Sequence, residues 1–131
     1  MCLVATYGWD MAGGGFPMGL IQAEMRTMGL NPPLPPSCGA SRMEVLRDLW
    51  TGAGLEAIET RNIAVQRTFA DFGDFWSTSL LTANLGSIVA AMAPDDVERL
   101  KDRVQARLPP DAAGRIICSA SANAIKGRKP K

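Results

Sequence analysis

The last third of the chain places a proline-bounded amphipathic helix before a strand, and this pair most constrains the fold. Pro94 suits the first turn of a helix, and the carboxylates of Asp95 and Asp96 stabilise its amino end. The apolar residues that follow recur at helical spacing and form one stripe, at Val97, Leu100, Val104 and Leu108. Two prolines end the helix, and residues 115–126 predict a final strand. A helix followed by such a strand indicates a mixed α/β protein.

Two more strands are predicted upstream. Residues 1–6 form a near-continuous apolar run, typical of a strand buried on both faces. Residues 55–68 largely alternate polar and apolar side chains, which favours a long strand with one solvent-exposed face. Ser41 and Glu44 form a capping-box pattern, which predicts the start of a helix. In all, four to five helices are expected, near 16–28, 41–52, 71–86, 87–92 and 94–108.

Composition excludes several kinds of chemistry. The chain has no histidine, which excludes Ser-His-Asp and Cys-His catalysis and any zinc site that contains histidine. Its three cysteines, Cys2, Cys38 and Cys118, are widely spaced, so neither a disulfide framework nor a metal site is expected. Two of them fall in predicted strands, where a buried, inert thiol is the default, and this usage suggests a cytoplasmic protein.

Charge and hydropathy also limit the expected partners. The net charge of +1 gives no indication of nucleic acid as a partner. No apolar stretch reaches the length of about 18 residues that a membrane-spanning helix needs, so no membrane span is predicted.

Aromatic side chains gather in two segments that are candidates for a substrate pocket. The first group follows the strand at 1–6 and contains Tyr7, Trp9, Asp10 and Phe16, and the second contains Phe72, Phe75 and Trp76. In open parallel sheets, ligands bind at the carboxyl ends of the strands, which favours a pocket at the first group. Ordinary packing of aromatic rings is the alternative for both groups.

No catalytic or metal-ligating residues are predicted. Glu56 and Glu59 lie three residues apart in a strand, so they point to opposite faces and cannot form an acid–base pair. The glycines at 13–15 are interpreted as a flexible turn, with a hinge for a substrate lid as the alternative.

Three segments carry a resemblance to a known family. They are Gly54-Leu55-Glu56 after the helix with Trp50, the stretch from Arg67-Thr68-Phe69 to Phe75-Trp76, and the junction from Leu108-Pro109 to Gly114-Arg115-Ile116. With the order of elements, they resemble the C-terminal portion of a class I S-adenosylmethionine-dependent methyltransferase, of the small-molecule, type 11-like kind. The resemblance covers essentially the whole chain.

This resemblance implies a fold. It implies a single domain over residues 1–131 with a partial Rossmann-like, small mixed three-stranded sheet, in which the last strand is antiparallel and inserts between the other two. Residues 71–92 would form the helical insert that covers the substrate.

The chain departs from the family at its front. It has no Gly-x-Gly-x-Gly loop after a first strand and no acidic residue that ends a second strand. In the family these elements hold the methionine part and the ribose of S-adenosylmethionine. The resemblance therefore implies a chain that binds no cofactor and is inactive alone, either a natural fragment or the product of a misplaced start. The alternatives are half of a split methyltransferase, or a non-enzymatic module for a small apolar ligand or for interaction and oligomerisation.

A homo-oligomer, most simply a dimer, is the expected assembly. In the complete family fold the strand at 1–6 pairs with a fourth strand that has no counterpart here. Its edge beside Leu3, Val4 and Ala5 would then be free, without a lysine or proline to block it. A two-fold contact between copies would satisfy such an edge.

Overall fold

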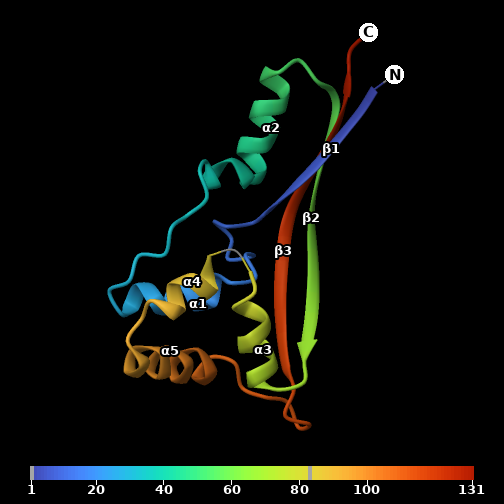
Figure 1. Cartoon of the computed structure of the whole chain (residues 1–131). Coiled ribbons are helices and arrows are strands. Elements are labelled where there is room, and N and C mark those ends of the chain that lie inside the picture. The colour runs from blue at the N-terminus through green and yellow to red at the C-terminus, as the bar shows by residue number, and fades with distance from the viewer. Residues whose placement is uncertain (1, 83) are drawn as a thin grey trace. The chain divides into compact units, whose positions relative to one another are not determined.

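The computed structural model describes residues 2–82 and 84–131 (Figure 1). Within them the chain has a mixed α/β fold with five α-helices, which confirms the predicted class and number of helices. In chain order the elements are β1 (Cys2–Trp9), α1 (Gly19–Thr27), the 3-10 turn η1 (Cys38–Ser41), α2 (Met43–Gly52), β2 (Glu56–Phe69), α3 (Phe72–Ser79), α4 (Leu85–Ala90), α5 (Pro94–Ala106) and β3 (Ile116–Lys129).

The three strands form one sheet in the order β1-β3-β2 (Figure 1). β1 pairs with β3 in a continuous antiparallel register that runs from Cys2 opposite Lys129 to Trp9 opposite Ala122. All three predicted strands are present, although Met1 of the first lies outside the described residues. The sheet is antiparallel and not mixed, because the middle strand runs opposite to both of its neighbours.

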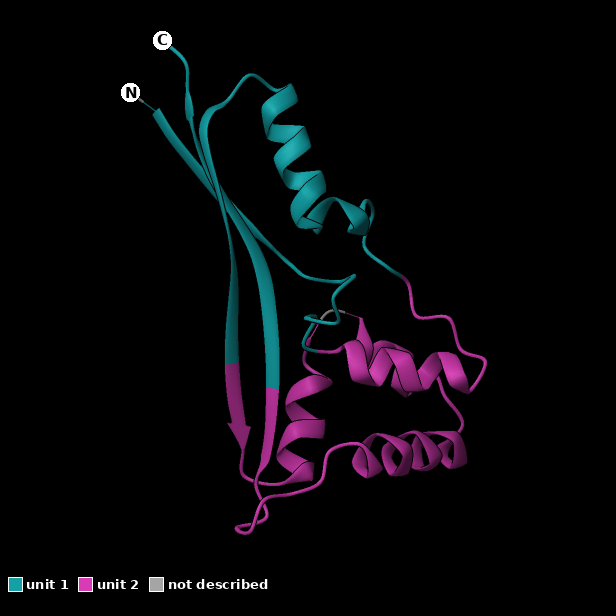
Figure 2. Cartoon of the chain, turned by 180° about the vertical axis from the view of Figure 1, so that it is seen from behind, with its two compact units in different colours: residues 1–17, 34–65, 119–131 teal, residues 18–33, 66–118 magenta. Residues whose placement is uncertain are grey.

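The contacts of the chain group into two compact units (Figure 2). Unit 1 contains residues 1–17, 34–65 and 119–131, and unit 2 contains residues 18–33 and 66–118. A single domain over residues 1–131 stays a prediction.

Unit 2 contains the main apolar core, formed by Ile21, Met25, Phe69, Phe75, Trp76, Leu85, Val89, Leu100, Val104 and Ile116. Leu100 and Val104 are fully buried, and Val97 and Leu108 pack against the core, which confirms the stripe predicted for α5. α1 contributes Ile21 and Met25 to the same core. Burial of these side chains is the main stabilising contribution to the unit.

The starts of α2 and α3 differ in how they are capped. Asp71 accepts a hydrogen bond from the backbone N–H of Asp74 at 2.8 Å, and the Asp74 carboxylate accepts one from the Ala70 N–H at 3.0 Å. The capping box predicted at Ser41 is wrong, because the Ser41 hydroxyl donates to the Cys38 carbonyl at 3.0 Å within η1. α2 begins after Arg42 without a side-chain cap.

In unit 1, α2 lies close to one face of the sheet. A Cβ atom added at Gly127 of β3 would lie 3.4 Å from the Trp50 ring of α2, so α2 packs closely over the strand at this glycine. Ile58 of β2 lies near the same glycine. We call the side of the sheet that carries Ile58 and Gly127 the α2 face.

The prediction that residues 1–6 are buried on both faces is wrong for the described residues. Leu3 and Val4 are 64% and 37% exposed, and every residue from Cys2 to Tyr7 is exposed. β1 is an edge strand of the sheet, so its side chains have strand neighbours on one side only, and η1 packs against it at Gly8, beyond the exposed residues. The exposed thiol of Cys2 likewise differs from the buried cysteine that was expected.

Candidate functional site

The face of the unit 1 sheet opposite to α2 is open and carries apolar and charged side chains. Alternation along β1 puts Leu3, Ala5, Tyr7 and Trp9 on one face. The register places Tyr7 beside Ala124 and Ala5 beside Lys126 of β3. Tyr7 is 70% exposed, and its alanine neighbour leaves the ring without a large partner on β3. We call this surface the open face; its residues are Leu3, Ala5, Tyr7, Trp9, Glu59, Arg61, Ala122, Ala124 and Lys126.

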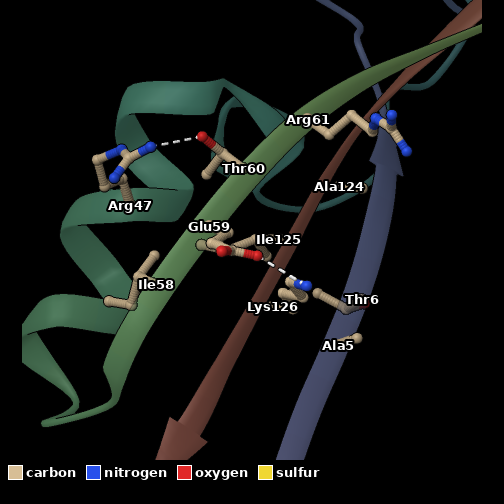
Figure 3. A pocket seen from close by; sticks show the side chains of 10 residues that line it. All are labelled: Ala5, Thr6, Arg47, Ile58, Glu59, Thr60, Arg61, Ala124, Ile125 and Lys126. Carbon is tan, nitrogen blue, oxygen red and sulfur yellow. Dashed lines mark hydrogen bonds and ion pairs between the residues drawn. The ribbon is translucent and has the colours of Figure 1, made fainter.

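A hollow of about 630 Å³ crosses the three strands beside α2 (Figure 3). Two polar pairs line it. The Lys126 ammonium donates to the Glu59 carboxylate at 2.7 Å, and the Arg47 guanidinium donates to the Thr60 hydroxyl at 2.6 Å. The full lining is Ala5, Thr6, Arg47, Ile58, Glu59, Thr60, Arg61, Ala124, Ile125 and Lys126.

The two polar pairs do not converge on one point. Glu59 and Thr60 are neighbours in β2, so their side chains point to opposite faces. Thr60 therefore belongs with Arg47 on the α2 face, and Glu59 with Lys126 on the open face. The hollow thus follows the strands and does not gather groups around one reacting atom.

Electrostatics on the open face favour charge pairing over acid–base chemistry. The hydrogen bond from Lys126, together with its charge, holds the pKa of the Glu59 carboxyl below its ordinary value. Glu59 is therefore ionised near neutral pH and has no proton to donate. Arg61 adds a second cation on this face, so Glu59 does not balance the local positive charge.

Asp10 and the glycines at 13–15 form a hydrogen-bonded turn. The Asp10 carboxylate accepts the Gly13 N–H at 3.0 Å, and the Asp10 carbonyl accepts the Gly15 N–H at 2.7 Å. Gly15 then accepts a hydrogen bond from the Ser121 N–H of β3 at 3.0 Å. A Cβ atom at Gly15 would collide with Ser121, so the glycine allows close docking of the turn on the strand. The carboxylate of Asp10 has a structural role here.

The other predicted pocket residues of unit 1 lie on or after β1. Trp9 is 37% exposed and stands opposite Ala122 on the open face. Phe16 is half-buried and follows the turn. Of the four residues predicted in this segment, Tyr7 and Trp9 share the open face.

The second predicted group lies in unit 2, on α3. Phe75 and Trp76 are buried in the core, and the Phe75 ring meets Phe69 edge-on at 5.4 Å. Phe72 is half-buried and stacks with Trp76 at 6.2 Å. These contacts favour the packing alternative for Phe75 and Trp76.

Asn123 has a structural role that its position in the sequence does not predict. Its side chain is buried and connects three elements of unit 1. The amide donates to the Ser41 carbonyl at 2.8 Å and accepts from the Asn62 amide at 2.9 Å. Its only sequence signal is an amide within an otherwise small and apolar strand.

A second hollow, of about 420 Å³, lies at the amino end of α2 and is lined by Asp10, Ala12, Gly13, Arg42, Met43, Glu44 and Asn123. Asp10 and Asn123 are already engaged in the hydrogen bonds of the turn and of Ser41. The remaining charges are one guanidinium and one carboxylate, Arg42 and Glu44.

Residues 2–82 and 84–131 contain neither a metal-binding group of side chains nor a helix that could span a membrane. No group of three or more Cys, Asp or Glu side chains is placed to hold a metal ion in that part of the chain. None of the helices described there has the length and apolar character needed to cross a membrane.

No protein-family model matches the chain, and no curated protein matches it significantly.

Proposed function

We propose that this chain is the substrate-side portion of an S-adenosylmethionine-dependent methyltransferase-like fold. The observation that carries the proposal is the position of β3. The last strand of the chain lies between β1 and β2 and runs antiparallel to both. In the family that the sequence resembles, the final strand inserts between the two preceding strands in this way.

The helices between the strands support the same proposal. α1 and α2 separate β1 from β2, whereas α3, α4 and α5 separate β2 from β3. In the proposed correspondence α3 and α4 are the substrate-covering insert, and α5 is the helix that precedes the last strand. The long connection between β1 and β2 is what two strands that run in the same direction require.

The methyl donor would have to be held by another part of the fold. The glycines at 13–15 are engaged in docking their turn on β3 through Gly15 and Ser121. Glycine-rich loops that bind a cofactor leave their backbone N–H groups open to it. Methyl transfer depends largely on bringing donor and acceptor together, so we expect the chain alone to be inactive.

Calorimetric titration with S-adenosylmethionine tests this proposal on two proteins. The chain alone should show no micromolar binding, and one-to-one micromolar binding would refute the proposal. A chimera that adds the first four strands of a small-molecule methyltransferase before β1 should bind the donor. A chimera that folds but binds no more tightly than the added strands alone would also count against it.

A second candidate function is an interaction module, and the exposure of β1 favours it. Leu3 and Tyr7 are 64% and 70% exposed on the open face. A protein usually covers such side chains with a partner or a ligand. If a small apolar ligand occupies the open face, a Tyr7→Ala variant should lose the binding that calorimetric titration detects in the wild type.

A further inference from the structure

The free edge of β1 can be assigned residue by residue. The Asp10 N–H donates to the Ser121 carbonyl directly opposite, at 3.0 Å, so this pair is hydrogen-bonded. Hydrogen-bonded and non-hydrogen-bonded pairs alternate along an antiparallel ladder. Val4 and Thr6 therefore bond to β3, whereas the N–H and C=O groups of Leu3, Ala5 and Tyr7 point to the opposite edge.

That edge lacks the usual protection against strand pairing. Natural edge strands carry lysine, proline, bulges or inward-pointing charges. β1 contains no lysine, proline or other charged residue, and its register with β3 is continuous, without a bulge. Because β1 has no charged side chain, it offers no ion-pair partner to a charged peptide. For the same reason, two copies of β1 can pair without charge repulsion.

The sequence of β1 is self-complementary in one antiparallel register. With Ala5 opposite Ala5 of a second copy, Leu3 faces Tyr7 and Val4 faces Thr6 on either side of the two-fold axis. These are aliphatic–aromatic and β-branched pairs, which stabilise antiparallel strands. The small alanine side chains meet at the axis.

A register shifted to Thr6 opposite Thr6 fits less well. It would require Trp9 to exchange hydrogen bonds with Leu3 of the second copy. The Trp9 carbonyl already accepts the Met11 N–H at 2.8 Å. The register centred on Ala5 uses only Leu3, Ala5 and Tyr7, whose backbone groups face the open edge.

We propose that β1 pairs with β1 of a second copy in the antiparallel register centred on Ala5, and so joins two three-stranded sheets edge to edge. This inference rests on the second candidate function and names its partner. A strand of a cofactor-binding portion would compete for the same edge. Loss of the dimer would therefore leave the proposal based on the position of β3 intact.

The first test compares two substitutions at Ala5 by light scattering at low micromolar concentration. The wild-type protein should scatter as a dimer, with twice the 14.0 kDa mass of one chain. Ala5→Pro removes an N–H that points away from β3, so it should leave each copy folded but give a monomer. Ala5→Val keeps that N–H and should remain dimeric. A monomeric wild type, or a dimeric Ala5→Pro variant with unchanged circular dichroism, overturns the proposal.

The second test fixes the register by cross-linking in a background without native cysteines, made by Cys2→Ser, Cys38→Ser and Cys118→Ala. Paired residues without hydrogen bonds have Cα atoms about 4.5 Å apart, which suits a disulfide. Oxidation of a mixture of Val4→Cys and Thr6→Cys proteins should give the mixed dimer. Cross-linking of Thr6→Cys with itself as the main product, or no cross-link in the mixture, contradicts the register.

Discussion

Glu24 shows how a single buried charge can join two helices of unit 2. The carboxylate is buried on α1 and accepts hydrogen bonds from Arg103 Nε at 2.9 Å and from Arg107 at 3.0 Å. These bonds hold the pKa of Glu24 below its ordinary value of 4.5, with the bond from Arg103 as the largest cause. A buried carboxylate is tolerated because both partners are cations at the end of α5.

Replacing Glu24 with glutamine should therefore destabilise the protein in a pH-dependent way. The folded-state pKa is lowered, so the stabilisation is present above 4.5 and is lost as the pH falls through the folded-state value. Urea unfolding at about pH 7 should show a loss of about 1–3 kcal/mol in Glu24→Gln. The loss should shrink as the solution is acidified.

The matched control is Glu98→Gln, which removes an exposed carboxylate 3.5 Å from Lys101 on α5. It should change the free energy of unfolding by less than about 0.5 kcal/mol. Equal losses in the two variants would show that Glu24 is no more important than a surface charge.

At the residue scale, the sequence predicted the chemical character of single side chains better than their hydrogen-bond and ion-pair partners. The absence of histidine excluded the catalytic and zinc sites that depend on it. Glu59 pairs with Lys126, whereas the positive φ of 52° at Ala57 interrupts the alternation from which its separation from Glu56 was predicted. The partners of Glu24 lie far along the chain, so the ion cluster depends on tertiary contacts that local spacing does not report. The role of Asn123 could not be predicted from the sequence, because its hydrogen-bond partners Ser41 and Asn62 lie in other elements.

At the element scale, β1 and α5 show why some predictions were confirmed and others were not. The stripe of α5 has one periodicity and one buried side, so sequence spacing predicts Leu100 and Val104 in the core. The apolar run at the start of the chain is equally compatible with an inner or an edge strand, and the sheet order decides its exposure. The same limit applies to Ser41, whose hydroxyl bonds within η1 instead of capping α2.

The turn after β1 gives a prediction for this scale. Gly15→Ala places a Cβ atom against Ser121 and should weaken the docking of the turn on β3. We expect a loss of about 1–3 kcal/mol in thermal or urea unfolding, as is usual for overpacking. Gly39→Ala serves as the control, because a Cβ atom there meets no neighbour within 4 Å. An unchanged Gly15→Ala protein would mean that the turn does not hold the strand.

At the scale of the whole molecule, β1 is an edge strand without charged residues or proline, and we propose that a second copy pairs with it. The periodicities predicted the three strands, and the resemblance implied that the last of them is antiparallel and lies between the other two, as the sheet shows. The open face was not, because composition does not tell which side of a sheet the helices leave uncovered. The division into two units likewise depends on long-range contacts.

Hydrogen exchange of the β1 amides over a range of protein concentrations tests this claim most directly. In dilute solution the amides of Val4 and Thr6 should be protected by β3, whereas those of Leu3, Ala5 and Tyr7 should exchange rapidly. At concentrations where the dimer forms, all five should be protected, and Ala5→Val should behave in the same way. Protection of Leu3, Ala5 and Tyr7 that does not change with concentration, or rapid exchange at all concentrations, would contradict the account.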